Sequence, residues 1–151
     1  CSSDLLSIGN SAPRRRSSAA GFFGETLPTA GLALESLLIN QRVRIGTALL
    51  EVSVARTPCA TFAGHLEEPG WTKRFAAHGR PGTYFRVVEP GAIRPGEVIE
   101  VLDTPNHGVD VRTLFAAAVG DDDAARVVVD AQCLPPMYHE RFTRRLTARI
   151  A

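Results

Sequence analysis

The sequence predicts a mainly β fold, a barrel or a sandwich, followed by a small helical tail. Between 21 and 103, short runs of alternating apolar and polar residues are separated by turn sequences. One helix-like stretch interrupts these runs. After Asp103 the pattern changes to amphipathic segments that are typical of helices. With 151 residues, the chain is long enough for one domain with a sizeable core.

Strands are expected at three places. A tight turn at Gly46 and Thr47 separates two runs. In the second run one face carries Ala48, Leu50, Val52 and Val54, and the other carries Leu49, Glu51 and Ser53. This period of two is typical of a half-buried strand. Further strands are expected at 83–88 and 97–102, because turns that contain Pro-Gly delimit them.

Helices are expected in four segments. In 71–79, Trp71 and Phe75 are four residues apart and Gly79 ends the helix. The tail contributes "VRTLFAAAVG", "DDDAARVVVDA" and "MYHERFTRRLTARI". Gly120 ends the first of these, and acids that suit a helix N-terminus open the second. The third repeats an apolar residue every four positions, at Tyr138, Phe142, Leu146 and Ile150.

We expect residues 1–20 to lie outside the fold, as a disordered or artefactual leader. The segment "SAPRRRSSAA" (11–20) has no usable period, and its arginines, proline and serines make a poor strand. The expected organisation is therefore a leader at 1–20, a β-barrel or sandwich at 21–103 and a helical tail at 104–151.

Charge and composition exclude several classes of function. The net charge of +1 gives no case for nucleic acid or an anionic membrane, and acids match the arginines of the tail. No apolar stretch approaches the roughly 18 residues of a membrane span. Three widely spaced cysteines favour a reducing cytoplasm. Lys73 is the only lysine, so no pyridoxal phosphate Schiff base is expected on this chain.

The stretch "ARTPCATFAG" (55–64) places Cys59 directly after a β-like run and Arg56-Thr57-Pro58. Free cysteines are commonly buried and inert. The position at a strand's rim and the nearby Arg56, which favours the thiolate, indicate instead a nucleophile or a metal ligand. Structural zinc is disfavoured because no cysteine or histidine pair has ligand spacing. A Cys–His dyad fits the spacing but lacks a known signature, so the residues alone leave core and reactive roles open.

Four motifs occur in the order and spacing of a MOSC domain, the C-terminal module of molybdenum-cofactor sulfurases: "GFFGETLPTAGL", "INQRVRIGTALLEV", "ARTPC" and "GRPGTYFRVVEPGAIRPGEVIEV". Over 21–151 the chain resembles stand-alone bacterial MOSC proteins with a helical tail. The resemblance implies a MOSC-type β-barrel. Family members carry further strands before the first motif, so we expect a barrel that is incomplete at its N-terminus. Such a chain would associate through an exposed edge and bind its cofactor weakly.

The resemblance also implies a function. MOSC proteins bind or handle molybdenum cofactor (molybdopterin), and some reduce N-hydroxylated compounds such as hydroxylamino bases or amidoximes. Cys59 matches the family cysteine that ligates molybdenum in the reductases, which implies a catalytic and metal-binding role. Such an enzyme needs a separate electron-donor protein. The alternative is a sulfur or cofactor carrier, in which a Cys59 persulfide serves a cofactor-receiving enzyme.

Cofactor-binding residues are implied by the same motifs and by the arginines beside them. The expected set is Gly24, Glu25, Thr26, Arg56, Thr57, Cys59, Arg80 and Arg86. The arginines suit this role because guanidinium groups can hold phosphate or a polar pterin bidentately. Thr26 stands where the family usually has asparagine, which changes the donor and acceptor pattern at that position.

Overall fold

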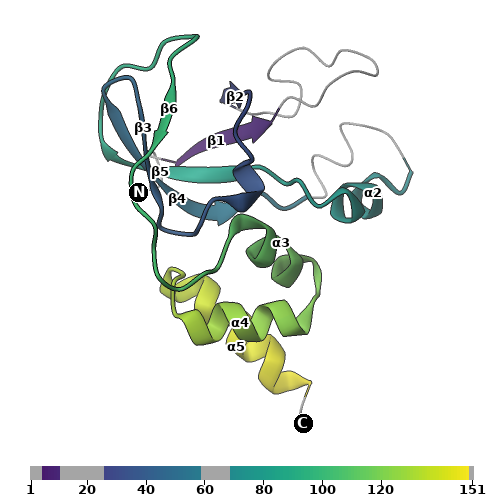
Figure 1. Ribbon diagram of the computed structural model, residues 1–151. Coiled ribbons are helices and arrows are strands. Elements are labelled where there is room, and N and C mark those ends of the chain that lie inside the picture. The colour runs from purple at the N-terminus through teal and green to yellow at the C-terminus, as the bar shows by residue number, and fades with distance from the viewer. Residues whose placement is uncertain (1–4, 11–25, 59–68, 150–151) are drawn as a thin grey trace.

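The computed structural model of the chain describes residues 5–10, 26–58 and 69–149. The first half of the chain forms β1 (Leu5–Asn10), β2 (Leu27–Thr29), the 3-10 turn η1 (Leu34–Ser36), β3 (Arg42–Ile45) and β4 (Ala48–Ala55). The second half forms α2 (Trp71–His78), β5 (Thr83–Glu89), β6 (Ile99–Val101), α3 (Val111–Val119), α4 (Asp122–Ala131) and α5 (Pro136–Ala148). Figure 1 shows the sheet on one side and the three C-terminal helices gathered on the other.

The six strands form one sheet in the order β2-β1-β5-β4-β3-β6. β1 and β2 are parallel and the other pairs are antiparallel. The tight turn expected at Gly46 and Thr47 joins β3 to β4, and Gly46 has a φ of +57°. A mainly β fold with a helical C-terminal portion is therefore confirmed. β2 and β6 stand at opposite edges, and no pairing joins them within the described ranges, so barrel closure stays a prediction.

β1 corrects the prediction that residues 1–20 lie outside the fold. Its residues pair with β5 on one side, with Ile8 opposite Thr83, and with β2 on the other, with Ile8 opposite Leu27. The three arginines and the proline that argued against a strand all lie after Asn10. Leu5–Asn10 is itself apolar enough to form a strand once β5 offers its hydrogen-bonding edge. The leader prediction was therefore wrong for this segment.

β4 lies between β3 and β5 and is buried on both faces. Leu50 and Val52 are fully buried on one face, and Leu49 and Ser53 are buried on the other. Only Glu51 is partly exposed. The prediction that this strand is half-buried was thus wrong, because both faces of β4 are covered in the folded chain.

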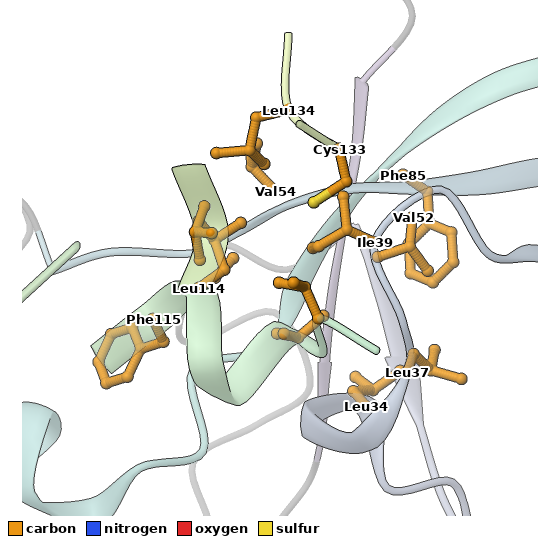
Figure 2. Close-up of a cluster of buried hydrophobic side chains, with 14 of the residues drawn as sticks. Leu34, Leu37, Ile39, Val52, Val54, Phe85, Leu114, Phe115, Cys133 and Leu134 are labelled. Carbon is orange, nitrogen blue, oxygen red and sulfur yellow. The ribbon is translucent and has the colours of Figure 1, made fainter. Parts of the chain in front are cut away.

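The C-terminal helices share one hydrophobic core with the sheet. Figure 2 shows Val52, Val54 and Phe85 from the strands in one cluster with Leu114 of α3 and with Cys133, which follows α4. All four helices expected from the sequence are present. Asp110 caps α3 by accepting a hydrogen bond from the Thr113 N–H (2.7 Å), as Asp and Asn do at helix starts. The tail is therefore packed against the sheet rather than folded around a core of its own.

The segment that leads into α3 is tied to the segment before β3 by main-chain and side-chain hydrogen bonds. The Ile39 N–H donates to the Val109 carbonyl (3.0 Å), and the Val111 N–H donates to the Leu37 carbonyl (2.9 Å). His107 adds two bonds, since its Nδ1 accepts from the Val109 N–H (3.0 Å) and its Nε2 lies 2.9 Å from the Ile39 carbonyl. These contacts orient α3 on the sheet.

The longest described helix, α5, has 13 residues, and none in the described chain is long and apolar enough to cross a membrane.

Candidate functional site

The carboxyl end of β4 and the amino end of β5 lie side by side. Ala55 is paired with Thr83, and the Arg56 N–H donates to the Gly82 carbonyl (3.2 Å). The buried Thr83 hydroxyl donates to the Val54 carbonyl (2.9 Å) and locks this end of the ladder. The Arg56-Thr57-Pro58 segment therefore begins next to the segment that leads into β5. Cys59 lies outside the described residues, so its role stays a prediction.

A pocket of about 390 Å³ includes Arg80, two residues before Gly82. It is lined by Glu35, His78, Gly79, Arg80 and Arg112. Glu35 comes from η1, His78 ends α2, Gly79 and Arg80 follow α2, and Arg112 lies in the first turn of α3. Three separate segments thus meet in one pocket, and three of its five lining residues are a glutamate and two arginines.

Glu35 is the buried centre of this pocket. Its side chain is 5% exposed, and its Oε1 accepts a hydrogen bond from Arg80 Nε at 2.9 Å. Arg112 Nη2 lies 3.8 Å from the same oxygen, too far for a hydrogen bond but close enough for charge attraction. Burial alone would raise the pKa of Glu35. The Glu35 backbone N–H and the two arginines outweigh burial and hold this pKa below its ordinary value of 4.5.

Arg80 reaches the pocket because of the glycine that precedes it. Gly79 ends α2 in the left-handed region, with φ +68°, a conformation that L side chains rarely adopt. This turn leads the chain out of the helix, and the buried Pro81 and Gly82 then carry it into β5. Arg80 is therefore held between a helix end and a strand start, with its side chain 48% exposed.

Arg86 lies elsewhere. It is on β5, and its guanidinium contacts Glu51 of β4, which also accepts from Arg42 Nε of β3 (3.2 Å). The charges of Arg42 and Arg86 are thus paired with that of Glu51 across neighbouring strands of the sheet. The structure therefore brings Arg80, but not Arg86, into the pocket.

The other expected site residues are placed as follows. Arg56 is half-buried beside Gly82, and Thr57 and Thr26 are exposed. Gly24 and Glu25, like Cys59, lie outside the described residues. Sequence reasoning missed Glu35, His78 and Arg112. Glu35 carried one usable signal, because it is the single charge within the apolar stretch "LALESLLI" at 32–39. Arg112 carried none, since it resembles an ordinary charge on an amphipathic helix.

Metal-binding groups are scarce in the described part of the chain. No group of three histidine, cysteine, aspartate or glutamate residues there is arranged to hold a metal ion. Cys133 is buried, and its burial raises the pKa of the thiol, so the thiolate that a metal would need is disfavoured. Cys133 is therefore a core residue.

Comparisons with known proteins agree with this fold. The MOSC domain family model matches residues 3–100, a range that includes β1. The uncharacterised protein YflK of Bacillus subtilis (strain 168) is 35% identical over 102 residues, covering 68% of this chain and 45% of that protein. The protein YiiM of Escherichia coli (strain K12) is 28% identical over 134 residues, covering 85% of this chain and 58% of that protein. The chain thus spans about half the length of these curated relatives.

A third relative carries the name of an activity. A protein of Gibberella moniliformis (strain M3125 / FGSC 7600) called a reductase is 35% identical over 86 residues, which is 56% of this chain and 15% of that protein.

Two solved structures have the same fold. YiiM from Geobacillus stearothermophilus has a TM-score of 0.79 at 24% identity, covering 93% of this chain and 77% of that one. YiiM from Escherichia coli has a TM-score of 0.72 at 26% identity, covering 85% and 65%. With a family model that matches well over half of its residues, the chain belongs to the MOSC domain family.

Proposed function

We propose that this MOSC protein binds molybdenum cofactor and reduces N-hydroxylated compounds such as hydroxylamino bases or amidoximes. Membership of the family supports cofactor binding, and the relative named a reductase supports the reaction class. The observation that carries the proposal is the arginine-lined pocket, whose Arg80 lies two residues before the Gly82 carbonyl that accepts a hydrogen bond from the Arg56 N–H. Arg56 is thus linked to the pocket through the Arg80–Gly82 segment, and Cys59 follows Arg56 by three positions in the sequence.

The residues of the pocket fit the chemistry of this cofactor. Molybdopterin carries a phosphate and a polar pterin, which need cationic donors. Arg80 and Arg112 bring two positive charges against the single negative charge of Glu35. The surplus of one positive charge suits an anionic ligand, and guanidinium groups can hold phosphate bidentately.

In the proposed enzyme each residue has a separate task. Arg80 and Arg112 would hold the polar and anionic parts of the cofactor, with Arg56 and Thr57 beside them. The Cys59 thiolate would ligate molybdenum, and Arg56 would favour that thiolate by its charge. The bound cofactor would supply the two-electron reduction of an N–OH group to N–H, consuming two protons and releasing water. A separate electron-donor protein would supply the electrons, and we expect both proteins in the cytoplasm.

The alternative proposal is a carrier. Its support is the same placement of Cys59 three residues after Arg56, because a thiolate can attack the outer sulfur of a donor persulfide, take that sulfur as its own persulfide and release the donor thiolate. In this role Cys59 would hold sulfur, or cofactor in transit, for a cofactor-receiving enzyme. No reduction would take place on this chain.

The test is to purify the protein and to measure molybdenum, pterin and turnover of an amidoxime with a chemical electron donor. Stoichiometric molybdenum with turnover supports the reductase, and metal-free protein with a persulfide on Cys59 supports the carrier. Protein with neither would contradict both proposals.

The matching substitution is Cys59→Ser. We expect it to abolish turnover and molybdenum retention while the free energy of unfolding changes little, because serine is nearly isosteric. Cys133→Ser is the control, and it should retain turnover because Cys133 belongs to the core. A loss of several kcal/mol for Cys59→Ser, the scale of a disrupted core, would show that Cys59 is structural instead.

A further inference from the structure

We propose that α2 is a gate for the charged pocket, which opens by local unfolding while the sheet and the C-terminal helices stay folded. The helix forms one wall of the pocket through His78, its last residue. Arg112 and the hydrogen bond between Glu35 and Arg80 lie outside α2. Opening therefore removes one wall and leaves the rest of the pocket in place. The gate does not depend on which molecule the pocket binds, so it is independent of the proposed function.

The first observation is that α2 has no fully buried side chain. Trp71 and Phe75 are half-buried, and Lys73 and Arg74 are exposed. In contrast, α3, α4 and α5 each bury at least one side chain in the core. Figure 1 shows α2 at the margin of the molecule, apart from α4 and α5. Because tertiary burial provides most of the stability of a helix in a protein, α2 is held less firmly than the other helices.

The second observation is the aromatic contact that docks α2 on α3. The rings of Trp71 and Phe75 lie 5.0 Å apart, and Phe75 meets Phe115 of α3 edge-to-face with ring centroids 5.9 Å apart. Phe115 is 2% exposed, so it is the fixed partner in the core. Aromatic pairs of this geometry add a modest free energy beyond that of their buried area. This contact therefore contributes far less than the free energy of global unfolding.

The third observation is the pair of glycines at the two ends of α2. Gly70 and Gly79 have φ values of +73° and +68°, and neither has a neighbour within 4 Å of an added Cβ. Glycine lets the chain turn in the left-handed region, and the open space lets it change direction without moving its surroundings. No side chain in the described part of the chain caps the amino end of the helix. The two glycines are thus placed as the hinges of the gate.

The length of α2 decides how the gate opens. The helix has 8 residues, and isolated helices shorter than roughly 12 residues are marginal in water. Once Phe75 leaves Phe115, the segment between the two glycines therefore unfolds instead of moving as a rigid helix. Local opening of this kind needs less free energy than global unfolding does.

Native-state proteolysis tests the gate, because Lys73 is the only lysine of the chain. A lysine-specific endopeptidase can therefore cut only within α2. When cleavage is slower than reclosing, the cleavage rate reports the population of the open form. Without denaturant, we expect cleavage at least about a hundredfold faster than the globally unfolded fraction, measured by urea unfolding, allows. A rate that matches the globally unfolded fraction would overturn the proposal.

The matched pair of variants is Gly79→Ala and Gly96→Ala. Both glycines have positive φ and open space at the Cβ position, but only Gly79 borders α2. Opening of α2 relieves the strain of an alanine at 79, so Gly79→Ala should raise the cleavage rate about fivefold, the equivalent of roughly 1 kcal/mol. Gly96→Ala should leave this rate unchanged, because only global unfolding relieves its strain. Equal increases in the two variants would show that cleavage follows global unfolding and that α2 is no gate.

Fluorescence of Trp71, the only tryptophan, gives a readout that needs no protease. Phe75→Leu removes the ring contacts with Trp71 and Phe115, so acrylamide quenching of Trp71 and the cleavage rate should increase together. Phe142→Leu is the control, since Phe142 is a buried core residue of α5. It should lower stability in urea and leave quenching and cleavage unchanged. The proposal is wrong if Phe75→Leu changes neither quenching nor cleavage.

Discussion

A single buried carboxylate organises the charged pocket. Glu35 stands within an apolar stretch, where an unpaired charge would be costly. Arg80 satisfies it with a hydrogen bond, and Arg112 adds attraction at longer range. Both arginines are about half-exposed, so solvent screens part of each interaction. The pocket can therefore keep its cations near each other at a modest cost in stability.

The pH dependence of stability follows from the lowered pKa of Glu35. A carboxyl group whose pKa is lower in the folded state stabilises the fold fully above its unfolded value, here 4.5, and this contribution is lost as the pH falls through the folded pKa. Glu35→Gln should thus lower the free energy of unfolding at pH 7 by about 1 to 2 kcal/mol, since the arginine can be resolvated. Urea unfolding of the unchanged protein and of Glu35→Gln measures this difference at pH 7 and at pH 3.5, which is roughly one unit below the unfolded pKa. The gap between the two proteins should narrow at the lower pH, and an unchanged gap would contradict this account.

At the scale of elements, the β3–β4 turn is held by the loop that follows β5. The Thr47 N–H donates to the Ala92 carbonyl (3.1 Å), and the Ala92 N–H donates to the Thr47 hydroxyl (2.8 Å). Gly91 permits this contact, because a Cβ there would lie 2.3 Å from the Thr47 carbonyl carbon and 2.4 Å from the Ala48 nitrogen. The turn sequence at 89–91 therefore serves long-range packing as well as a local change of direction.

Gly91→Ala is expected to destabilise the protein by about 2 kcal/mol or more, because main-chain atoms rather than flexible side chains must move. Gly96→Ala in the same loop is the control. Gly96 has φ +86° but nothing within 4 Å of an added Cβ, so only backbone strain of about 1 kcal/mol is expected. Thermal unfolding of the two variants measures the difference, and equal losses would mean that the close approach contributes nothing.

β1 has a structural role that deletion can measure. It covers the edge of β5 and is the partner of β2. Removing residues 1–10 should expose the edge of β5 and lower stability, and the shortened chain should associate through that edge. Size-exclusion chromatography and urea unfolding check both effects. A shortened chain that is monomeric and equally stable would restore the prediction that these residues lie outside the fold.

At the scale of the whole molecule, the helical portion completes the core. Val111 and Ala117 of α3 and Val128 of α4 are fully buried, and they belong to the same cluster as Val52 and Phe85 of the sheet. Ion pairs and hydrogen bonds of Arg145 and Arg149 with the α3–α4 region hold α5 in place. These arginines are committed to packing, as the balance of charges in the tail suggested.

A chain that ends at residue 103 is therefore expected not to fold. Its sheet would expose the apolar surface that α3 and α4 cover, and it would also lose the hydrogen bonds between 37–41 and 107–111. We expect a broad, non-cooperative urea transition and binding of a hydrophobic dye. A sharp transition like that of the whole chain would show instead that the two portions are independent, as the boundary predicted at residue 104 would allow.

Elements whose signals are local could be predicted from the sequence alone. The Gly46-Thr47 turn, the strand at 83–88 and the helix ends at Gly79 and Gly120 depend on residues within a few positions of one another, and the structure confirms them. The MOSC motifs likewise led to the family and to Arg80. β1 was missed for two reasons. The arginines that follow it argued against a strand, and its partner β5 lies far along the chain, so no local pattern indicated the pairing.

The composition of the pocket, in contrast, depends on tertiary packing and could not be predicted from the sequence. Glu35 and Arg80 are 45 residues apart in sequence, and Arg112 comes from a helix of the tail. No local pattern can pair residues at such separations, because their proximity follows from how η1, β5 and α3 pack together. Arg80 and Arg86 belong to one sequence motif but have different partners for the same reason. Arg80 pairs with Glu35 at the pocket, and Arg86 pairs with Glu51 on the neighbouring strand.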